Sequence, residues 1–220
     1  AIGVFGYDGV LATLTTLVGS VNSGRILCAY LRGTRSPAYE LGAAMAAVMA
    51  FEEDPARPLN TLALTGIAVP AISQRLSRTE QESLLYNGVT PIEVGPGEVA
   101  QIVRAVSTYI HNASGIDDIA LLDITTIRTL DYVRKACRER IELRFPREKL
   151  SSKTADKVRD QLLDVLYLLE DLEIVEEVAA NEDGLLVERD IQDPNRLDAK
   201  IPTDVVNGLH IFAARIDLLL

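Results

Sequence analysis

The chain changes character along the stretch GIDDIALLDITTIRTLDYVRKACRERIELRFPREKL (115–150). Before it, short apolar runs alternate with helical patterns. After its start, two long helical patterns come first and only short strand-like runs follow. We therefore expect two domains, 1–116 and 117–220, with a boundary near Gly115 to Asp118.

The first domain is expected to be a layered α/β unit, a sheet with helices on its faces. Ser36 should cap one helix with Pro37 as its first residue, and Ser77 with Glu80 should form a capping box that starts another. The predicted helices cover about 10–21, 37–53 and 78–86, and the predicted strands cover 25–32, 59–64, 89–94 and 99–106.

Two long amphipathic helices should open the second domain, from about Thr125 to Leu143 and from about Thr154 to Leu172. The pattern after Asp171 is that of antiparallel strands. The predicted strands are IVEEVA (174–179), LLVERDI (185–191), RLDAKI (196–201) and LHIFAARIDLLL (209–220). The fold class expected for the whole chain is therefore mixed α/β.

Composition excludes several classes of partner. With 32 acidic and 22 basic residues, the chain carries a formal charge of −10, which opposes binding to nucleic acid. No apolar run has the length needed to span a bilayer, so we expect a soluble protein without membrane contacts. Cys28 and Cys137 lie inside apolar patterns, which predicts core thiols in a reducing compartment.

The opening residues AIGVFGYDGVLATLTTL (1–17) place Gly3, Gly6 and Gly9 ahead of a helical pattern. A glycine-rich loop at a helix start can bind phosphate, and Arg32 after the next strand can contact a 2′-phosphate. The spacing nevertheless differs from the dinucleotide-binding G-x-G-x-x-G. We favour a tight strand-to-helix turn in which Gly6 and Gly9 allow conformations and close packing that other residues resist. A nucleotide-binding domain or α/β enzyme is the alternative.

Other chemical candidates lack the spacing that their chemistry requires. The two histidines, His111 and His210, have no H-x-x-x-H or C-x-x-C context for a metal. GSVNSG (19–24) is not a nucleophile elbow, and the adjacent carboxylate pairs such as Glu52-Glu53 are typical of solvated surface. We predict no catalytic residues, no cofactor and no metal.

Several stretches together resemble one family. The 115–150 stretch is similar to the segment that opens the C-terminal domain of contractile phage tail sheath proteins, with the pattern LD-x-x-T-x-x-T-L-x-Y-x-R. VERDIQDPNRLDAKIPTDVVNGLHIFAARIDLLL (187–220) resembles that family's C-terminal strands. The sheath core of Mu-like phages is similar to FGYDGVLATLTTL (5–17), DPARPLNTLALTGIAVP (54–70) and SRTEQESLLYNGVTPIEV (77–94).

The resemblance implies a structural subunit that polymerises around a tail tube and contracts to drive injection. Its implied partners are other copies of itself in stacked rings, the tail tube protein, and baseplate and tail terminator proteins. Its implied location is the virion tail, assembled in the cytoplasm of the host bacterium. Sheath proteins of this type are longer at the N-terminus, so the resemblance also suggests that the chain is a fragment.

Charge is divided unevenly along the second domain. The range 125–150 holds eight Lys or Arg and four Asp or Glu, whereas 159–193 holds twelve acidic and two basic residues. Such surfaces can meet between copies in a head-to-tail contact, and we predict Arg138 and Arg144 as contact residues. The alternative is ordinary solvated helix faces with local ion pairs.

The apolar run at the end of the chain is the second predicted contact. An uncovered apolar strand favours pairing with another chain, and the resemblance to sheath proteins, which weave terminal strands between neighbours, favours it too. The alternative is a strand buried in its own sheet. The contact residues predicted here are Leu209, Ile211, Phe212, Ile216 and Leu218.

Overall fold

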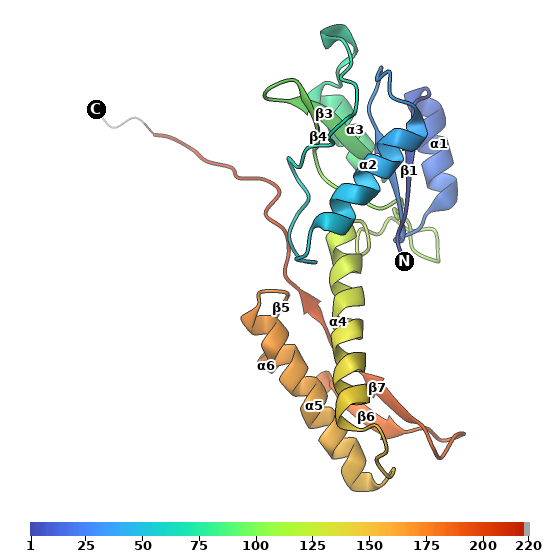
Figure 1. Ribbon diagram of the computed structural model, residues 1–220, viewed down its shortest axis with the longest axis vertical. Coiled ribbons are helices and arrows are strands. Elements are labelled where there is room, and N and C mark those ends of the chain that lie inside the picture. The colour runs from blue at the N-terminus through green and yellow to red at the C-terminus, as the bar shows by residue number, and fades with distance from the viewer. Residues whose placement is uncertain (218–220) are drawn as a thin grey trace. The chain divides into compact units, whose positions relative to one another are not determined.

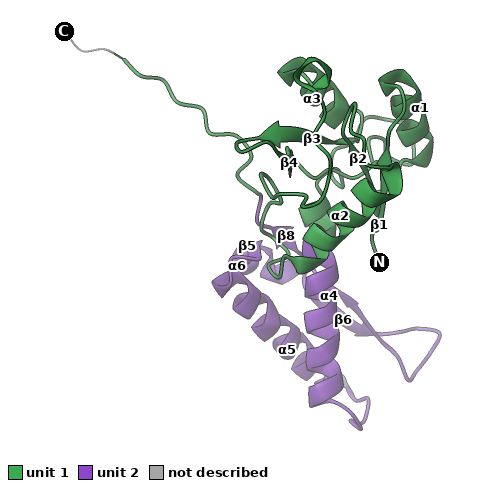
Figure 2. Cartoon of the chain, turned by 45° about the horizontal axis from the view of Figure 1, so that its top comes forward, with its two compact units in different colours: residues 1–127, 208–220 green, residues 128–207 purple. Residues whose placement is uncertain are grey.

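The computed structural model describes residues 1–217, and its contacts divide the chain into two compact units (Figures 1 and 2). Unit 1 comprises residues 1–127 together with 208–220, and unit 2 comprises residues 128–207. The division after Ile127 falls later in the chain than the domain boundary predicted at 116/117. That domain boundary stays a prediction. The mixed α/β fold class is confirmed.

Unit 1 is built on a four-stranded sheet with the order β1-β2-β3-β4. The first three strands are parallel, and β4 returns antiparallel to β3 after a turn through Pro96 and Gly97. The strands are β1 (Gly3–Tyr7), β2 (Ile26–Tyr30), β3 (Thr90–Gly95) and β4 (Val99–Ile102). The helices are α1 (Leu11–Val21), α2 (Ala38–Phe51) and α3 (Arg78–Tyr86), with a short 3₁₀ turn at Ile72–Gln74.

Strand β2 is buried on both faces, which gives unit 1 two cores. Successive side chains of a strand point to opposite faces. Leu27 and Ala29 therefore enter one core, which also contains Leu41 and Met45 of α2. Cys28 and Tyr30 enter the other core, together with Leu14 and Val18 of α1 and Leu84 of α3. The result is three layers, with α2 on one side of the sheet and α1 and α3 on the other.

Glycines at the crossing of α2 and β1 allow the helix to lie directly on the strand. A Cβ atom on Gly6 would lie 2.1 Å from the carbonyl oxygen of Ala38, and one on Gly42 would lie 2.8 Å from the nitrogen of Gly6. The close packing expected of the opening glycines is thus present at Gly6. Gly6 lies inside β1, however, and not in the turn that follows the strand.

Unit 2 packs a long helix against a second helix and short strands. Its elements are α4 (Ile124–Arg144, from residue 128 onward), α5 (Ser152–Asp171), β5 (Val175–Glu176), α6 (Val178–Asn181), a 3₁₀ turn (Glu182–Gly184), β6 (Leu186–Arg189), β7 (Leu197–Lys200) and β8 (Asp204–Val205). β5 pairs with β8 and β6 pairs with β7, both antiparallel. The core joins Val133 and Cys137 of α4 to the buried face of α5, which includes Val158, Leu162, Leu166 and Leu169.

Three predicted elements differ in the structure because single residues depart from the regular backbone. In 59–64, Thr61 has a φ of 63°, and only an isolated bridge between Ala63 and Gln101 forms. In 174–179, Glu177 has a φ of 55°, so β5 stops and α6 begins. Helix α2 begins at Ala38, one residue late, because the hydroxyl oxygen of Ser36 accepts from the amide of Ala68 at 2.9 Å instead of capping the helix.

The predicted terminal strand is the largest difference. Residues 208–217 form no strand, and their apolar side chains do not join either core of unit 1. The interpretation of this run as a strand within its own sheet is therefore wrong for the described residues.

Substitution of Gly6 by alanine tests the close crossing of α2 and β1. The added methyl group meets backbone atoms that cannot rotate away, so we expect the free energy of unfolding to fall by about 1–3 kcal/mol. Gly19→Ala is the matched control, because a Cβ at that helical position would meet no atom within 4 Å apart from its chain neighbours and the backbone of its own helix. The control should raise stability by up to about 1 kcal/mol. Equal urea unfolding curves for the two variants would contradict the packing described here.

Candidate functional site

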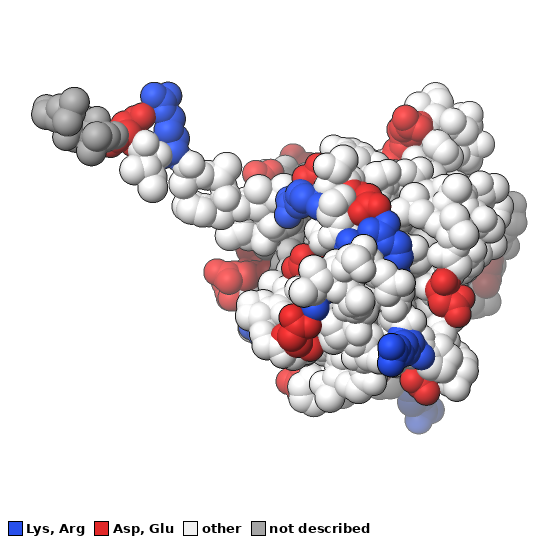
Figure 3. Space-filling view, turned by 90° about the horizontal axis from the view of Figure 1, so that it is seen from above, with Lys and Arg blue, Asp and Glu red and all other residues white. Residues whose placement is uncertain are grey.

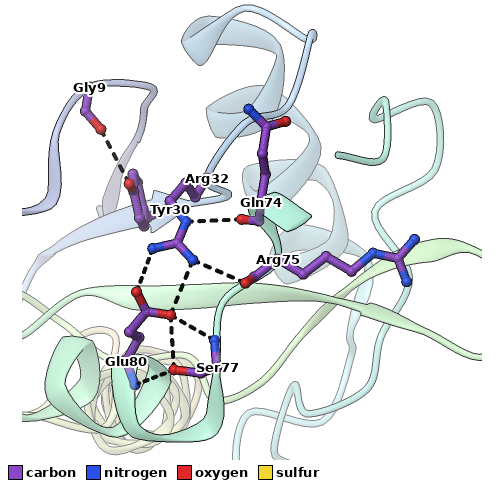
Figure 4. Close-up of polar contacts among 7 residues, drawn as sticks. All are labelled: Gly9, Tyr30, Arg32, Gln74, Arg75, Ser77 and Glu80. Atoms are coloured by element: carbon purple, nitrogen blue, oxygen red, sulfur yellow. Dashed lines mark hydrogen bonds and ion pairs between the residues drawn. The ribbon is translucent and has the colours of Figure 1, made fainter. Parts of the chain in front are cut away.

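Arg32 was the residue considered for a 2′-phosphate, and the structure commits its guanidinium to the chain itself (Figure 4). Its Nε donates to the carbonyl of Gln74 at 2.9 Å, and Nη2 donates to the carbonyl of Arg75 at 3.0 Å. Both terminal nitrogens also bind the two carboxylate oxygens of Glu80. This bidentate pair ties the end of β2 to the start of α3 and leaves the guanidinium occupied.

The contact between Arg32 and Glu80, called the joint below, also includes hydrogen bonds between Glu80 and Ser77. The predicted capping box is confirmed: Glu80 Oε2 accepts from the amide of Ser77 at 2.8 Å, and the Ser77 hydroxyl oxygen accepts from the amide of Glu80 at 3.3 Å. The hydrogen bond from Arg32, followed by those from Ser77, lowers the pKa of Glu80 from 4.5 to about 2. Tyr30, next to this joint, donates to the carbonyl of Gly9 at 3.2 Å and so holds the opening loop.

The remaining chemical candidates are structural in the same way. Ser20 donates to the carbonyl of Leu17 at the end of α1, and Ser23 accepts from the amide of Arg25 in the turn before β2, so both serines of GSVNSG make local structural hydrogen bonds. Burial raises the pKa of Cys28 to about 12 and that of Cys137 to about 11, which keeps both thiols protonated. Among residues 1–217, no group of three or more His, Cys, Asp or Glu is placed to hold a metal ion.

The predicted basic contacts lie on an exposed face of α4. Arg138 and Arg144 are exposed, and neither makes a side-chain hydrogen bond or ion pair within the described part of the chain. Neighbouring basic residues do form local pairs: Arg134 binds Asp131 at 3.0 Å and Lys135 approaches Glu139 at 3.8 Å. The local-pair alternative therefore describes part of this helix, and Arg138 and Arg144 are the charges that it leaves available.

The terminal segment (residues 208–217) projects from unit 1 with apolar side chains in water. The exposed fractions of Leu209, Ile211, Phe212 and Ile216 are 78%, 70%, 84% and 94%. In the space-filling view the segment is mostly uncharged until its end (Figure 3). Leu218, the fifth predicted contact, lies outside the described residues. No helix in the described part of the chain is long and apolar enough to cross a membrane.

His210 makes a contact that sequence reasoning missed. It was considered only as a metal ligand, whereas its ring packs against Asn60 and Asp123 of unit 1. The one available signal was a polar residue interrupting the apolar run LHIF. Partners 87 and 150 positions away in sequence could not be inferred from that signal.

Comparisons with known proteins agree with this architecture. The family model described as "Phage tail sheath protein central domain" matches residues 4–108. The family model described as "Phage tail sheath C-terminal domain" matches residues 117–218. The chain belongs to the phage tail sheath family. A tail sheath protein of the Mu-like prophage FluMu from Haemophilus influenzae is 33% identical to it, over 96% of this chain and 46% of the relative. The sheath chain thus spans about half the length of that curated relative.

Solved structures share the fold of this sheath chain at low sequence identity. One is a sheath complex, named PVC, of an extracellular contractile injection system in the contracted state; it has a TM-score of 0.69 and 14% identity, over 96% of this chain and 62% of that one. Another is the helical sheath of the anti-feeding prophage in the contracted state, with a TM-score of 0.64 and 14% identity, over 96% and 59%. The resemblance noted in the sequence is confirmed.

The joint between Arg32 and Glu80 gives a pH-dependent prediction. The pKa of Glu80 is lower in the folded chain than its ordinary 4.5, so its contribution to stability is present above about pH 4.5 and is lost as pH falls toward about 2. Glu80→Gln should lower the free energy of unfolding by about 1 kcal/mol at neutral pH, because the pair is partly exposed. The difference from the unsubstituted chain should shrink toward zero near pH 2.

Glu82→Gln is the matched control for this experiment. It removes an exposed pair with Arg78 from the same helix without touching the joint. Chemical unfolding at a series of pH values measures both variants. A Glu80→Gln difference that stays constant from neutral pH to about pH 2 would contradict the assignment.

Proposed function

We propose that this chain is the core and C-terminal part of a contractile tail sheath subunit, which polymerises around a tail tube and contracts to drive injection. The observation that carries the proposal is the exposed terminal segment, on a chain of this family. Its apolar residues belong to neither core of their own unit. Burying a Leu, Ile or Phe side chain contributes about 1.5–3 kcal/mol, so the free segment leaves several kcal/mol available to association.

We infer that the segment pairs with a neighbouring copy. An extended backbone has unpaired N–H and C=O groups, and adding it to an exposed strand edge satisfies them. A contact between two different surfaces of one subunit is head-to-tail and need not close, so it can build a helical array. Arg138 and Arg144 supply a second contact in this proposal, to the acidic range 159–193 of another copy. Exposed charges of this kind direct docking more than they stabilise the fold.

The wider role follows from the family. We propose other copies in stacked rings, the tail tube, the baseplate and the tail terminator as partners, the virion tail as location, and assembly in the host cytoplasm. We propose that the chain has no enzymatic activity. The alternative of a nucleotide-binding enzyme loses its phosphate contact, because Arg32 is held by Glu80. The domain boundary at 116/117 belongs to the same proposal.

Charge reversal on α4 tests the second contact. In a full-length sheath protein carrying this sequence, Arg138→Glu with Arg144→Glu should reduce polymer yield at least tenfold while leaving the melting temperature of the 220-residue chain within a few degrees. Arg35→Glu with Arg78→Glu is the control, because it changes net charge equally on unit 1. Sedimentation measures the polymer. Equal yields from the two double variants would contradict a specific role for α4.

Truncation after His210 tests the terminal segment. It removes the residues from Ile211 onward. The described ones among them, residues 211–217, contribute nothing to either core, so the melting temperature and circular dichroism of the 220-residue chain should not change. The same truncation in the full-length protein should abolish the polymer seen by electron microscopy. A truncated protein that still forms sheath of normal length would sink the proposed role of this segment.

A further inference from the structure

The terminal segment is held to unit 1 at one place, its first three residues. We propose that His210 is a positioning residue: its ring clamps the base of the segment (Gly208–His210) to unit 1 and sets where the free arm (residues 211–217) leaves the subunit. The clamp itself is a property of this chain. Its use in directing the arm to a neighbour rests on the proposed function.

The ring is enclosed on two sides by groups of unit 1. His210 Nδ1 lies 3.0 Å from Asn60 Nδ2, and Nε2 lies 3.5 Å from Asp123 Oδ1. The His210 side chain is only 14% exposed, in contrast to its apolar neighbours Leu209 and Ile211. The polar residue of LHIF (209–212) is therefore the one that docks, and the flanking apolar residues are left in water.

The docking groups are fixed by the end of β4 and by the residues that follow it. The amide of Thr61, next to Asn60, donates to the carbonyl of Ile102 at 2.7 Å. Asp123 sits between Leu122, whose carbonyl accepts from Ser107, and Ile124, whose amide donates to the carbonyl of Ala105. One half of the clamp is thus held by backbone hydrogen bonds of unit 1, and the other half lies on the terminal segment.

Gly208 gives independent evidence that the base is fitted to this surface. A Cβ atom at this position would lie 2.5 Å from Cγ of Pro58 and 3.2 Å from Nε2 of His210. Only glycine allows the chain to approach Pro58 this closely while the ring reaches Asp123. His210, through its ring, and Gly208, through the absence of a side chain, are therefore both needed for this contact.

The charged groups around the ring come from unit 1. The charged groups that face it are Asp123 and, on the far side of that carboxylate, Arg104, whose Nε lies 3.3 Å from Asp123 Oδ1. Asn60 is neutral, and Arg57 from the same segment approaches Glu52 and Asp54 instead. Burial raises the pKa of Asp123, but the nearby His210 ring and the hydrogen bonds from Arg104 outweigh it, so the pKa lies below its ordinary value.

The Asn60 side chain can pair with the ring in either of two ways. Asn60 Nδ2 lies 3.0 Å and Asn60 Oδ1 lies 3.3 Å from His210 Nδ1, so Nδ1 can accept from the amide nitrogen or donate to the amide oxygen. His210 Nε2 is buried and makes no hydrogen bond within the described residues, and it lies 3.5 Å from Asp123 Oδ1. The clamp therefore combines one hydrogen bond with a close approach to a carboxylate.

The test measures backbone ¹⁵N relaxation of residues 208–217 in the 220-residue chain. In the unsubstituted chain, residues 208–210 should show order parameters near those of the sheet, and 211–217 should be mobile. His210→Ala should make 208–210 as mobile as the arm, Gly208→Ala should do the same with the ring intact, and His210→Gln should restore part of the order. His111→Ala is the control and should change nothing at 208–217.

The pair of variants separates a clamp from simple packing, because Gly208→Ala leaves the ring in place and His210→Ala leaves the glycine in place. Unchanged order in both His210→Ala and Gly208→Ala would overturn the inference. Polymer yield of the full-length variants is the second readout. A lost clamp with normal polymers refutes only its directing role, whereas a working clamp in a protein that forms no polymer counts against the proposed function instead.

Discussion

Strand β2 has no face in water, and the layers of unit 1 depend on this. Its alternate side chains fill two separate cores, so α2 must lie on one side of the sheet and α1 with α3 on the other. The close approach of α2 to β1 also requires residues without a Cβ atom at the crossing, and these are Gly6 and Gly42. Arg32, just beyond β2, then ties α3 to the strand through Glu80. Core, helix placement and the joint at the strand end therefore follow from one buried strand.

Elements marked by local chemistry could be predicted from the sequence. The capping box of Ser77 and Glu80 started α3 as expected, and the apolar stripe through Val158 and Leu162 was buried as expected. Elements decided by tertiary contacts could not. Ser36 bonds Ala68 instead of its helix, and Glu177 adopts a left-handed backbone that no local pattern signals. The clamp at His210 was missed for the same reason, because its partners are distant in sequence.

The exposed terminal segment and the free charges of α4 are different kinds of surface. The segment offers apolar area and unpaired backbone, which can hold subunits together. Arg138 and Arg144 offer charge in water, which selects orientation and can be exchanged at low cost when contacts rearrange. In the proposed function, the segment supplies a link that persists and the charges supply contacts that change. Anchoring the segment through His210 would let the link persist while the rest of the subunit surface is rearranged.

The central claim is that residues 211–217 leave their own subunit and pair with another. Electron cryo-microscopy of the assembled full-length sheath tests it most directly, by tracing the chain from the base of the segment outward. The account predicts that Gly208–His210 stay on their own unit 1 while the following residues lie along a strand edge of a neighbouring subunit. A trace in which residues 211–217 fold back onto their own subunit, or remain in solvent without a partner, would contradict it.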